Sequence, residues 1–231
     1  MKKKVFILLA ALSLLVATLC AQETTMYVMK NGAIAYQSVV SEVDSIIFYK
    51  PIIVPEDGVL INGVVWAKYN VGAPGTFVNS PEDAGMFYQW NRKIGWSTTN
   101  PMINSDGDNT WNSSVSIGDI WEKANDPCPL GWRMPTLQEL QQLVDMGSEW
   151  DTVNGMAGRI FGTGSNSLFL PAAGYRLNSS GALVGAYNGN YWGGPREISI
   201  SAYYLGFNIG EANVYGTWQM ADGRSCRCVA E

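Results

Sequence analysis

Short runs of alternating apolar and polar residues, separated by glycine-rich turns, dominate the chain. The first two runs predict strands over residues 26–30 and 33–37. Asn31-Gly32 between them is typical of a type I′ hairpin turn. A third strand is predicted over residues 43–49. Residues 22–50 are therefore expected to form a small β-hairpin element with too little core to stand alone, and the prolines and acids of residues 51–57 indicate a linker.

Residues 58–231 carry a continuous pattern and are predicted to form one domain. Two short strands are expected around Asn62-Gly63, within residues 59–68. A helix start is predicted at residues 80–83, where a serine cap precedes a proline and two acids. The clearest helix covers residues 137–146, because Thr136 and Glu139 form a capping box and Gly147 is a good stop.

Strand patterns follow this helix, over residues 158–161, 168–176, 182–186, 201–209, 214–220 and 224–230. One or two helices early and strands late indicate an α+β fold with a mainly antiparallel sheet.

The N-terminus has the pattern of an export signal. Three lysines, residues 2–4, precede an apolar run over residues 5–19, which is shorter than the roughly 20 residues that a membrane-spanning helix needs. We expect residues 1–21 to be a signal peptide cut after Ala21, and the mature protein to be extracellular, on the outer surface or in the periplasm, with no membrane span. Lipid anchoring at Cys20 is the less favoured alternative, since Leu19 precedes the cysteine where a small residue is expected.

Composition then narrows the function. The chain has no histidine, which removes the commonest general base and ordinary zinc sites. Loss of residues 1–21 removes three lysines and takes the formal net charge from −5 to −8. Such a chain repels phosphate backbones, so nucleic acid is excluded as a partner. Aromatic residues at 12% with 25 glycines describe a turn-rich domain packed by aromatic rings.

Eight of the nine tryptophans fall into two groups. Five lie in or beside apolar segments and are predicted to be core: Trp66, Trp90, Trp121, Trp132 and Trp192. Trp96, Trp111 and Trp150 lie in polar segments. Trp96 and Trp111 belong to residues 94–117, which are predicted to form a long ordered loop held by its own tryptophans.

Several motifs occur in an order that resembles the Fibrobacter succinogenes major paralogous domain family. Residues 126–136 read DPCPLGWRMPT and are followed by Glu139-Leu140, residues 169–176 read FLPAAGYR, residues 189–192 read GNYW, and residues 227–229 read RCV. Residues 62–67, NGVVWA, resemble the opening phrase of the family. The resemblance covers about residues 58–231, and residues 22–50 resemble a short N-terminal element of secreted Bacteroidetes proteins.

The resemblance implies a C-type lectin-like fold, related also to the formylglycine-generating enzymes, and a secreted or surface protein without assigned activity. It also implies a disulfide between Cys128 and Cys228 that ties the helix to the last strand. Cys226 is then left over, either as a buried thiol or, with Cys228, as part of a redox or copper site.

Three groups of acidic residues invite other interpretations. Residues 106–109, DGDN, could hold calcium, but the spacing matches no EF-hand and favours a turn that caps its own backbone. Glu82 with Asp83, or Glu149 with Asp151, could serve as glycosidase carboxylates, but sequence neighbours give no evidence of two acids facing across a cleft. The sequence predicts no catalytic residue, no metal and no cofactor.

The expected function is a non-enzymatic binding module for a glycan or a protein at the cell surface. A Tyr/Asn-rich C-terminal stretch suits adaptable recognition, and the candidate ligand-binding residues are Trp96, Trp111, Tyr187, Asn188, Asn190, Tyr191, Tyr204, Tyr215 and Trp218. Two alternatives stay open: an oxidase of the formylglycine-generating kind that uses the C-terminal cysteines, and a structural subunit of a surface assembly attached through residues 22–50.

Overall fold

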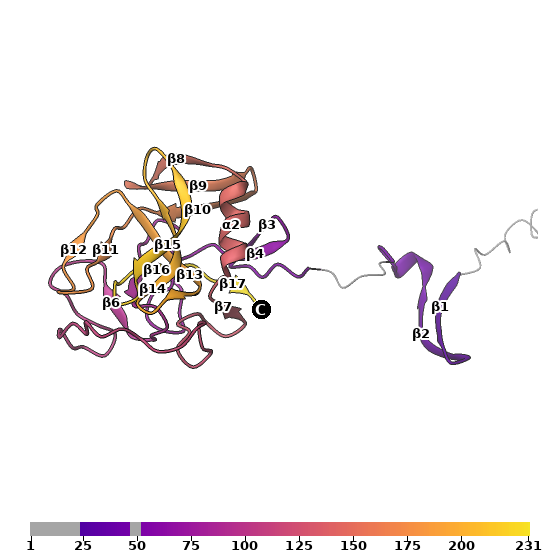
Figure 1. The fold of residues 1–231 in the computed structure, drawn as a ribbon. Coiled ribbons are helices and arrows are strands. Elements are labelled where there is room, and N and C mark those ends of the chain that lie inside the picture. Colours follow the sequence, from indigo (N-terminus) through magenta and orange to yellow (C-terminus); the bar gives the residue numbers. More distant parts are fainter. Residues whose placement is uncertain (1–23, 47–51) are drawn as a thin grey trace, which may run out of the picture. The chain divides into compact units, whose positions relative to one another are not determined.

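The structure is a computed structural model that describes residues 24–46 and 52–231. The chain divides into two compact units, at residues 53 and 54 (Figure 1). The predicted signal peptide and Cys20 lie outside the described residues.

The first unit is an antiparallel hairpin of β1 (Thr25–Lys30) and β2 (Ala33–Val39), followed by a 3-10 turn, η1 (Val40–Glu42). Asn31 and Gly32 have φ of 53° and 78°, as the predicted type I′ turn requires. The strand predicted over residues 43–49 is wrong where the structure describes it, because residues 43–46 form no strand; residues 47–49 lie outside the described residues.

A four-stranded sheet in the order β15-β14-β13-β16 forms the centre of the second unit. Its strands are β13 (Gly189–Ile198), β14 (Ser201–Phe207), β15 (Ala212–Gln219) and β16 (Ser225–Cys226). The first three strands pair antiparallel, and β16 runs parallel to β13.

A second four-stranded sheet, in the order β3-β4-β17-β7, joins the two ends of this unit. It contains β3 (Gly58–Ile61), β4 (Val64–Ala67), β7 (Trp132–Arg133) and β17 (Val229–Ala230). The turn between β3 and β4 has positive φ at Asn62 and Gly63, at 48° and 80°, so the predicted hairpin is present.

Three smaller sheets complete the fold. One is a meander of β8 (Ser148–Val153), β9 (Met156–Thr163) and β10 (Asn166–Pro171). The others pair β5 (Met86–Tyr88) with β6 (Gly95–Ser97) and β11 (Tyr175–Arg176) with β12 (Leu183–Val184). The class is α+β and mainly antiparallel, as predicted.

The α-helix α2 (Leu137–Asp145) begins at the predicted capping box. The Thr136 hydroxyl accepts from the Glu139 N–H at 3.2 Å, and the Glu139 carboxylate accepts from the Thr136 N–H at 2.7 Å. Leu140 and Leu143 are buried, so the predicted apolar stripe faces the core. In the part of the chain that the structure describes, no helix has the length and apolar character needed to cross a membrane.

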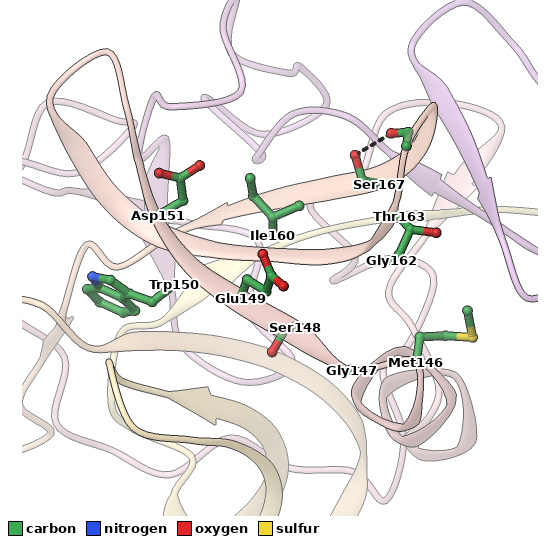
Figure 2. A pocket seen from close by; sticks show the side chains of 11 residues that line it. Met146, Gly147, Ser148, Glu149, Trp150, Asp151, Ile160, Gly162, Thr163 and Ser167 are labelled. Carbon is green, nitrogen blue, oxygen red and sulfur yellow. Dashed lines mark hydrogen bonds between the residues drawn. The ribbon is translucent and has the colours of Figure 1, made fainter.

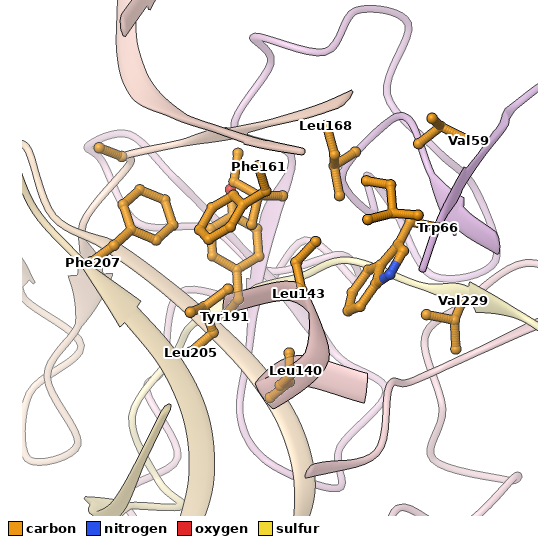
Figure 3. Close-up of a cluster of buried hydrophobic side chains, with 13 residues drawn as sticks. Val59, Trp66, Leu140, Leu143, Phe161, Leu168, Tyr191, Leu205, Phe207 and Val229 are labelled. Atoms are coloured by element: carbon orange, nitrogen blue, oxygen red, sulfur yellow. The ribbon is translucent and has the colours of Figure 1, made fainter. Parts of the chain in front are cut away.

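Two apolar clusters lie on opposite faces of the central sheet, because side chains alternate along each strand. On one face Tyr191, Leu205 and Phe207 pack with the helix and with Phe161 (Figure 3). On the other face lie Trp192, Tyr204 and Ala202, together with Trp90 and Trp132. Of the five tryptophans predicted as core, Trp66, Trp90, Trp132 and Trp192 are buried and Trp121 is partly buried.

The disulfide between Cys128 and Cys228 is confirmed, with a Cα–Cα distance of 6.0 Å across 100 residues of sequence. Cys128 precedes β7 and the helix, and Cys228 immediately precedes β17. The bond therefore ties the segment before the helix to the final strand.

The helix predicted at residues 80–83 is wrong, because these residues form a turn. Gly85 follows with φ of +73°, and a Cβ at this position would lie 2.2 Å from the Val71 carbonyl oxygen. The chain reverses here to enter β5, so a helix cannot continue through it.

Candidate binding site

An open pocket of about 320 Å³ lies on the exposed part of the central sheet, on the face that carries Tyr204. Strands β13, β14 and β15 and the short strand β11 supply its walls, with the segment before β13 and the turn after β14. The lining residues are Tyr175, Asn188, Gly189, Asn190, Tyr204, Gly206, Phe207, Asn208, Tyr215 and Trp218.

Cross-strand pairing sets the aromatic wall. Tyr204 is paired with Trp192 on one side and with Tyr215 on the other. The Tyr204 and Tyr215 rings stack at 5.5 Å between centroids, and Trp218 lies 6.2 Å from Tyr204. Gly206 leaves room for this stack, because a Cβ there would approach both tyrosine rings to about 3.0 Å. The rings are therefore fixed by their neighbours.

A buried arginine lies among these rings. The Arg224 guanidinium carbon is 3.9 Å from the Tyr204 ring centroid and 4.8 Å from that of Trp192, and Tyr175 and Trp218 lie at 5.1 and 5.5 Å. Cation–π attraction is strongest when the cation is desolvated, and Arg224 is fully buried. The arginine therefore fills the inner side of the aromatic wall.

The charge of Arg224 is balanced inside the protein. Its Nη2 donates to Asp222 Oδ2 at 3.2 Å, and Asp222 is also buried. Burial lowers the pKa of Arg224 and raises the pKa of Asp222, while the attraction between the two opposes both shifts. Asp222 also accepts from the Asn178 N–H at 2.8 Å. The pair presents no net charge to the pocket.

Asn190 connects this pair to the pocket wall. Its Oδ1 accepts from Arg224 Nη1 at 2.7 Å, which fixes the orientation of the amide. Among the described residues, neither Asn190 Nδ2 nor Arg224 Nε has a hydrogen-bond partner, and both nitrogens are buried. An unpaired buried donor costs about 1–3 kcal/mol, so this corner of the pocket is polar and incompletely satisfied.

Five of the sequence-predicted ligand residues meet at this pocket: Asn188, Asn190, Tyr204, Tyr215 and Trp218. Their exposure differs, since Trp218 is 40% exposed and Tyr204 only 6%. Tyr187 is highly exposed but does not line the pocket.

Three other predicted ligand residues have structural positions instead. Trp96 is 2% exposed and packs against Trp111 at 4.8 Å. Trp111 is partly buried, and its indole N–H donates to the Asn178 carbonyl at 2.8 Å. Tyr191 is 1% exposed on the opposite face of the sheet, where its hydroxyl donates to the Pro171 carbonyl at 2.9 Å. These three residues do not line the pocket.

Sequence reasoning missed Tyr175, Arg224 and Asp222. Tyr175 belongs to the FLPAAGYR motif, and Arg224 and Asp222 flank Gly223 just before the last two strands. Opposite charges at Asp222 and Arg224 within an apolar, aromatic stretch indicate a buried ion pair. The rings that surround Arg224 could not be found in this way, because they come from strands distant in sequence.

A larger hollow of about 780 Å³ lies on the β8–β10 sheet (Figure 2). Glu149 and Asp151 are two residues apart on β8, so both project from the same strand onto one face. They do not flank a cleft from opposite sides, as glycosidase carboxylates do. Trp150 points to the other face and packs partly against the core.

The cysteines do not form an open pair. Cys228 is bonded to Cys128, and Cys226 is a buried free thiol whose pKa is raised by burial. Reactive cysteines need a low thiol pKa and access to solvent. Cys226 has neither.

The DGDN segment caps its own backbone. Asn104 Oδ1 accepts from the N–H groups of Asp106 and Asp108, both at 2.9 Å. Asp108 accepts from the N–H groups of Asn109 and Thr110, which lowers the pKa of its carboxyl. Among the residues in the described ranges, no group of three or more acidic or cysteine side chains is placed to hold a metal ion.

Comparisons with known proteins find no match to a family model, to a curated protein or to a solved structure.

Proposed function

We propose that the protein is an exported, non-enzymatic binding module of C-type lectin-like fold, which holds a surface glycan or protein in the pocket on β13–β15. The observation that carries this proposal is the aromatic wall around Arg224. Its rings pack around the buried Arg224 and against one another, and Trp218 and Tyr215 line the pocket. Rigid aromatic side chains give a large contact area at a low entropic cost, which suits recognition.

The oxidase alternative has less support. It requires Cys226 and Cys228 together in a cleft, whereas Cys228 is held in the disulfide and Cys226 is fully buried. With no histidine in the chain and no open thiol pair among the described residues, binding explains the exposed aromatic pocket better than catalysis does.

A second candidate is favoured by the N-terminal hairpin. Both faces of this hairpin expose apolar side chains: Tyr27, Val28, Met29, Ile34 and Tyr36 are each 48–56% exposed. Exposed apolar strands are typical of attachment surfaces, which supports a role for this unit in a surface assembly. Exchange of Val28 and Tyr36, which are paired across the strands, for threonine should keep the hairpin but reduce retention of the protein at the cell surface.

The proposed binding function is tested with Trp218→Ala. The purified full chain is applied to immobilised neutral and charged polysaccharides and to cell-surface protein fractions. We expect the substitution to weaken binding at least about tenfold, as for an interface hot spot. Tyr187→Ala is the matched control, because it removes an exposed ring outside the pocket. Equal binding by wild type and both variants would contradict the proposal.

A further inference from the structure

We infer that the ligand is an uncharged pyranose ring of a neutral glycan, bound without a metal ion. The inference rests on the proposed function and names the class of ligand for the same pocket.

The charge of the pocket lining favours an uncharged ligand. The pocket lining contains tyrosine, asparagine, glycine, phenylalanine and tryptophan, and no lysine, arginine, aspartate or glutamate. The nearest buried charges, Arg224 and Asp222, neutralise each other. The Tyr215 hydroxyl donates to Oε1 of Glu211 at 3.2 Å, and Glu211 itself does not line the pocket. An anionic ligand would lose its hydration without gaining a counter-charge, which is costly.

The aromatic wall also disfavours a cationic ligand. Aromatic cages bind cations on the faces of their rings. Here the protein's own guanidinium already lies within 5.5 Å of four ring centroids. Trp192 and Tyr204 are buried, so only the accessible sides of Tyr175 and Trp218 are left for a ligand. An electron-rich ring face attracts the polarised C–H groups of a sugar.

The amides supply matching polar groups. Asn208 Oδ1 accepts from the N–H groups of Gly210 and Glu211 at 2.7 and 3.2 Å, so the amide nitrogen is the end left to donate. Asn188 is exposed beside it. Asn190 also lines the pocket, and its buried Nδ2 has no hydrogen-bond partner among the described residues. Such donors suit a ligand that carries hydroxyl groups around an apolar ring face.

The size of the pocket also favours a sugar. A volume of about 320 Å³ lies at the lower end of the roughly 300–1,000 Å³ typical of small-ligand pockets. It suits one or two sugar rings better than the side chains of an extended peptide. Because no carboxylate lines the pocket, a chelator should not affect binding.

The experiment titrates the purified full chain with oligosaccharides of neutral glucan, mannan and galactan, and in parallel with oligogalacturonate and chitosan fragments. Calorimetry and saturation-transfer NMR report binding, with and without EDTA. We expect a neutral series to bind with EDTA present. Trp218→Ala should weaken that binding at least about tenfold, while Trp218→Phe, which keeps a ring, should cost less than about fivefold. Asn188→Ala should weaken it several-fold, and Tyr187→Ala should leave it unchanged.

The outcomes separate the two proposals. If only charged sugars or proteins bind and Trp218→Ala abolishes that binding, the neutral-glycan inference is overturned while the binding function stands. Loss of neutral-sugar binding in EDTA would overturn the metal-free mode. If no ligand of any class depends on Trp218, both proposals fail.

Discussion

Removal of the Cys128–Cys228 disulfide is expected to destabilise the protein without changing its fold. The bond closes a loop of 100 residues. On the chain-entropy model, a loop of this length in the unfolded state is worth about 4.7 kcal/mol. We expect Cys128→Ala/Cys228→Ala to lower the free energy of unfolding by about 4–5 kcal/mol.

The effect should fall mainly on the unfolded chain, because other contacts hold both ends of the bond. Asp126 accepts from the Cys128 N–H at 2.8 Å and from the Met134 N–H at 3.0 Å, which fixes the turn before the helix. The Cys228 carbonyl accepts from the Ala67 N–H at 2.9 Å, which anchors the last strand to β4. Native geometry at both ends should therefore survive without the covalent link.

Urea unfolding followed by tryptophan fluorescence measures the change, in a Cys226→Ala background that prevents thiol exchange. The Cys226→Ala protein with its disulfide intact is the control. In thermal unfolding, the loss corresponds to a fall in melting temperature on the order of 10 °C for a domain of this size. A loss below about 1 kcal/mol, or altered near-ultraviolet circular dichroism, would refute the reasoning.

Four further substitutions separate structural from binding roles. Thr136→Ala removes the helix cap and should lower the unfolding free energy by about 1 kcal/mol, measured by urea titration against Thr136→Ser. Arg224→Met leaves Asp222 buried without its ion-pair partner and should lower the free energy of unfolding by about 3–5 kcal/mol. Adding Asp222→Asn should recover part of this loss, and a double variant as unstable as Arg224→Met alone would contradict the ion-pair explanation. Trp96→Ala should lower the free energy of unfolding by about 3–5 kcal/mol because the ring is buried. Trp218→Ala should lower it by less than about 1 kcal/mol because its ring is half-exposed. Equal losses of stability in thermal melts would show that burial does not separate the two tryptophans.

The sequence predicted the turns and the helix start that depend on residues adjacent in the chain. The Asn-Gly turns at residues 31–32 and 62–63 have positive φ at both positions, and the capping box starts the helix at Leu137. The same turn signal at Asn154-Gly155, with φ of 48° and 85°, joins β8 to β9. It could have revealed β8, whose polar residues hid it from an analysis based on apolar alternation.

The candidate site was only partly predictable, because burial depends on distant segments. Trp96 lies in a polar loop by sequence, but that loop is fixed by Arg176, which donates to the carbonyls of Ser97 and Thr99 at 2.7 and 2.6 Å. Arg224 contacts rings that lie up to 49 residues earlier in the chain, at Tyr175. The periodicity of the sequence cannot predict contacts between segments that are so far apart in the chain.

The most direct test of the binding pocket is an NMR titration that follows the tryptophan indole N–H signals as the best-binding neutral oligosaccharide is added. We predict that the Trp218 signal shifts in a saturable manner and that the Trp150 signal, on the β8–β10 sheet, does not move. A saturable shift at Trp150 with Trp218 unchanged would place the ligand on the other sheet and contradict the account.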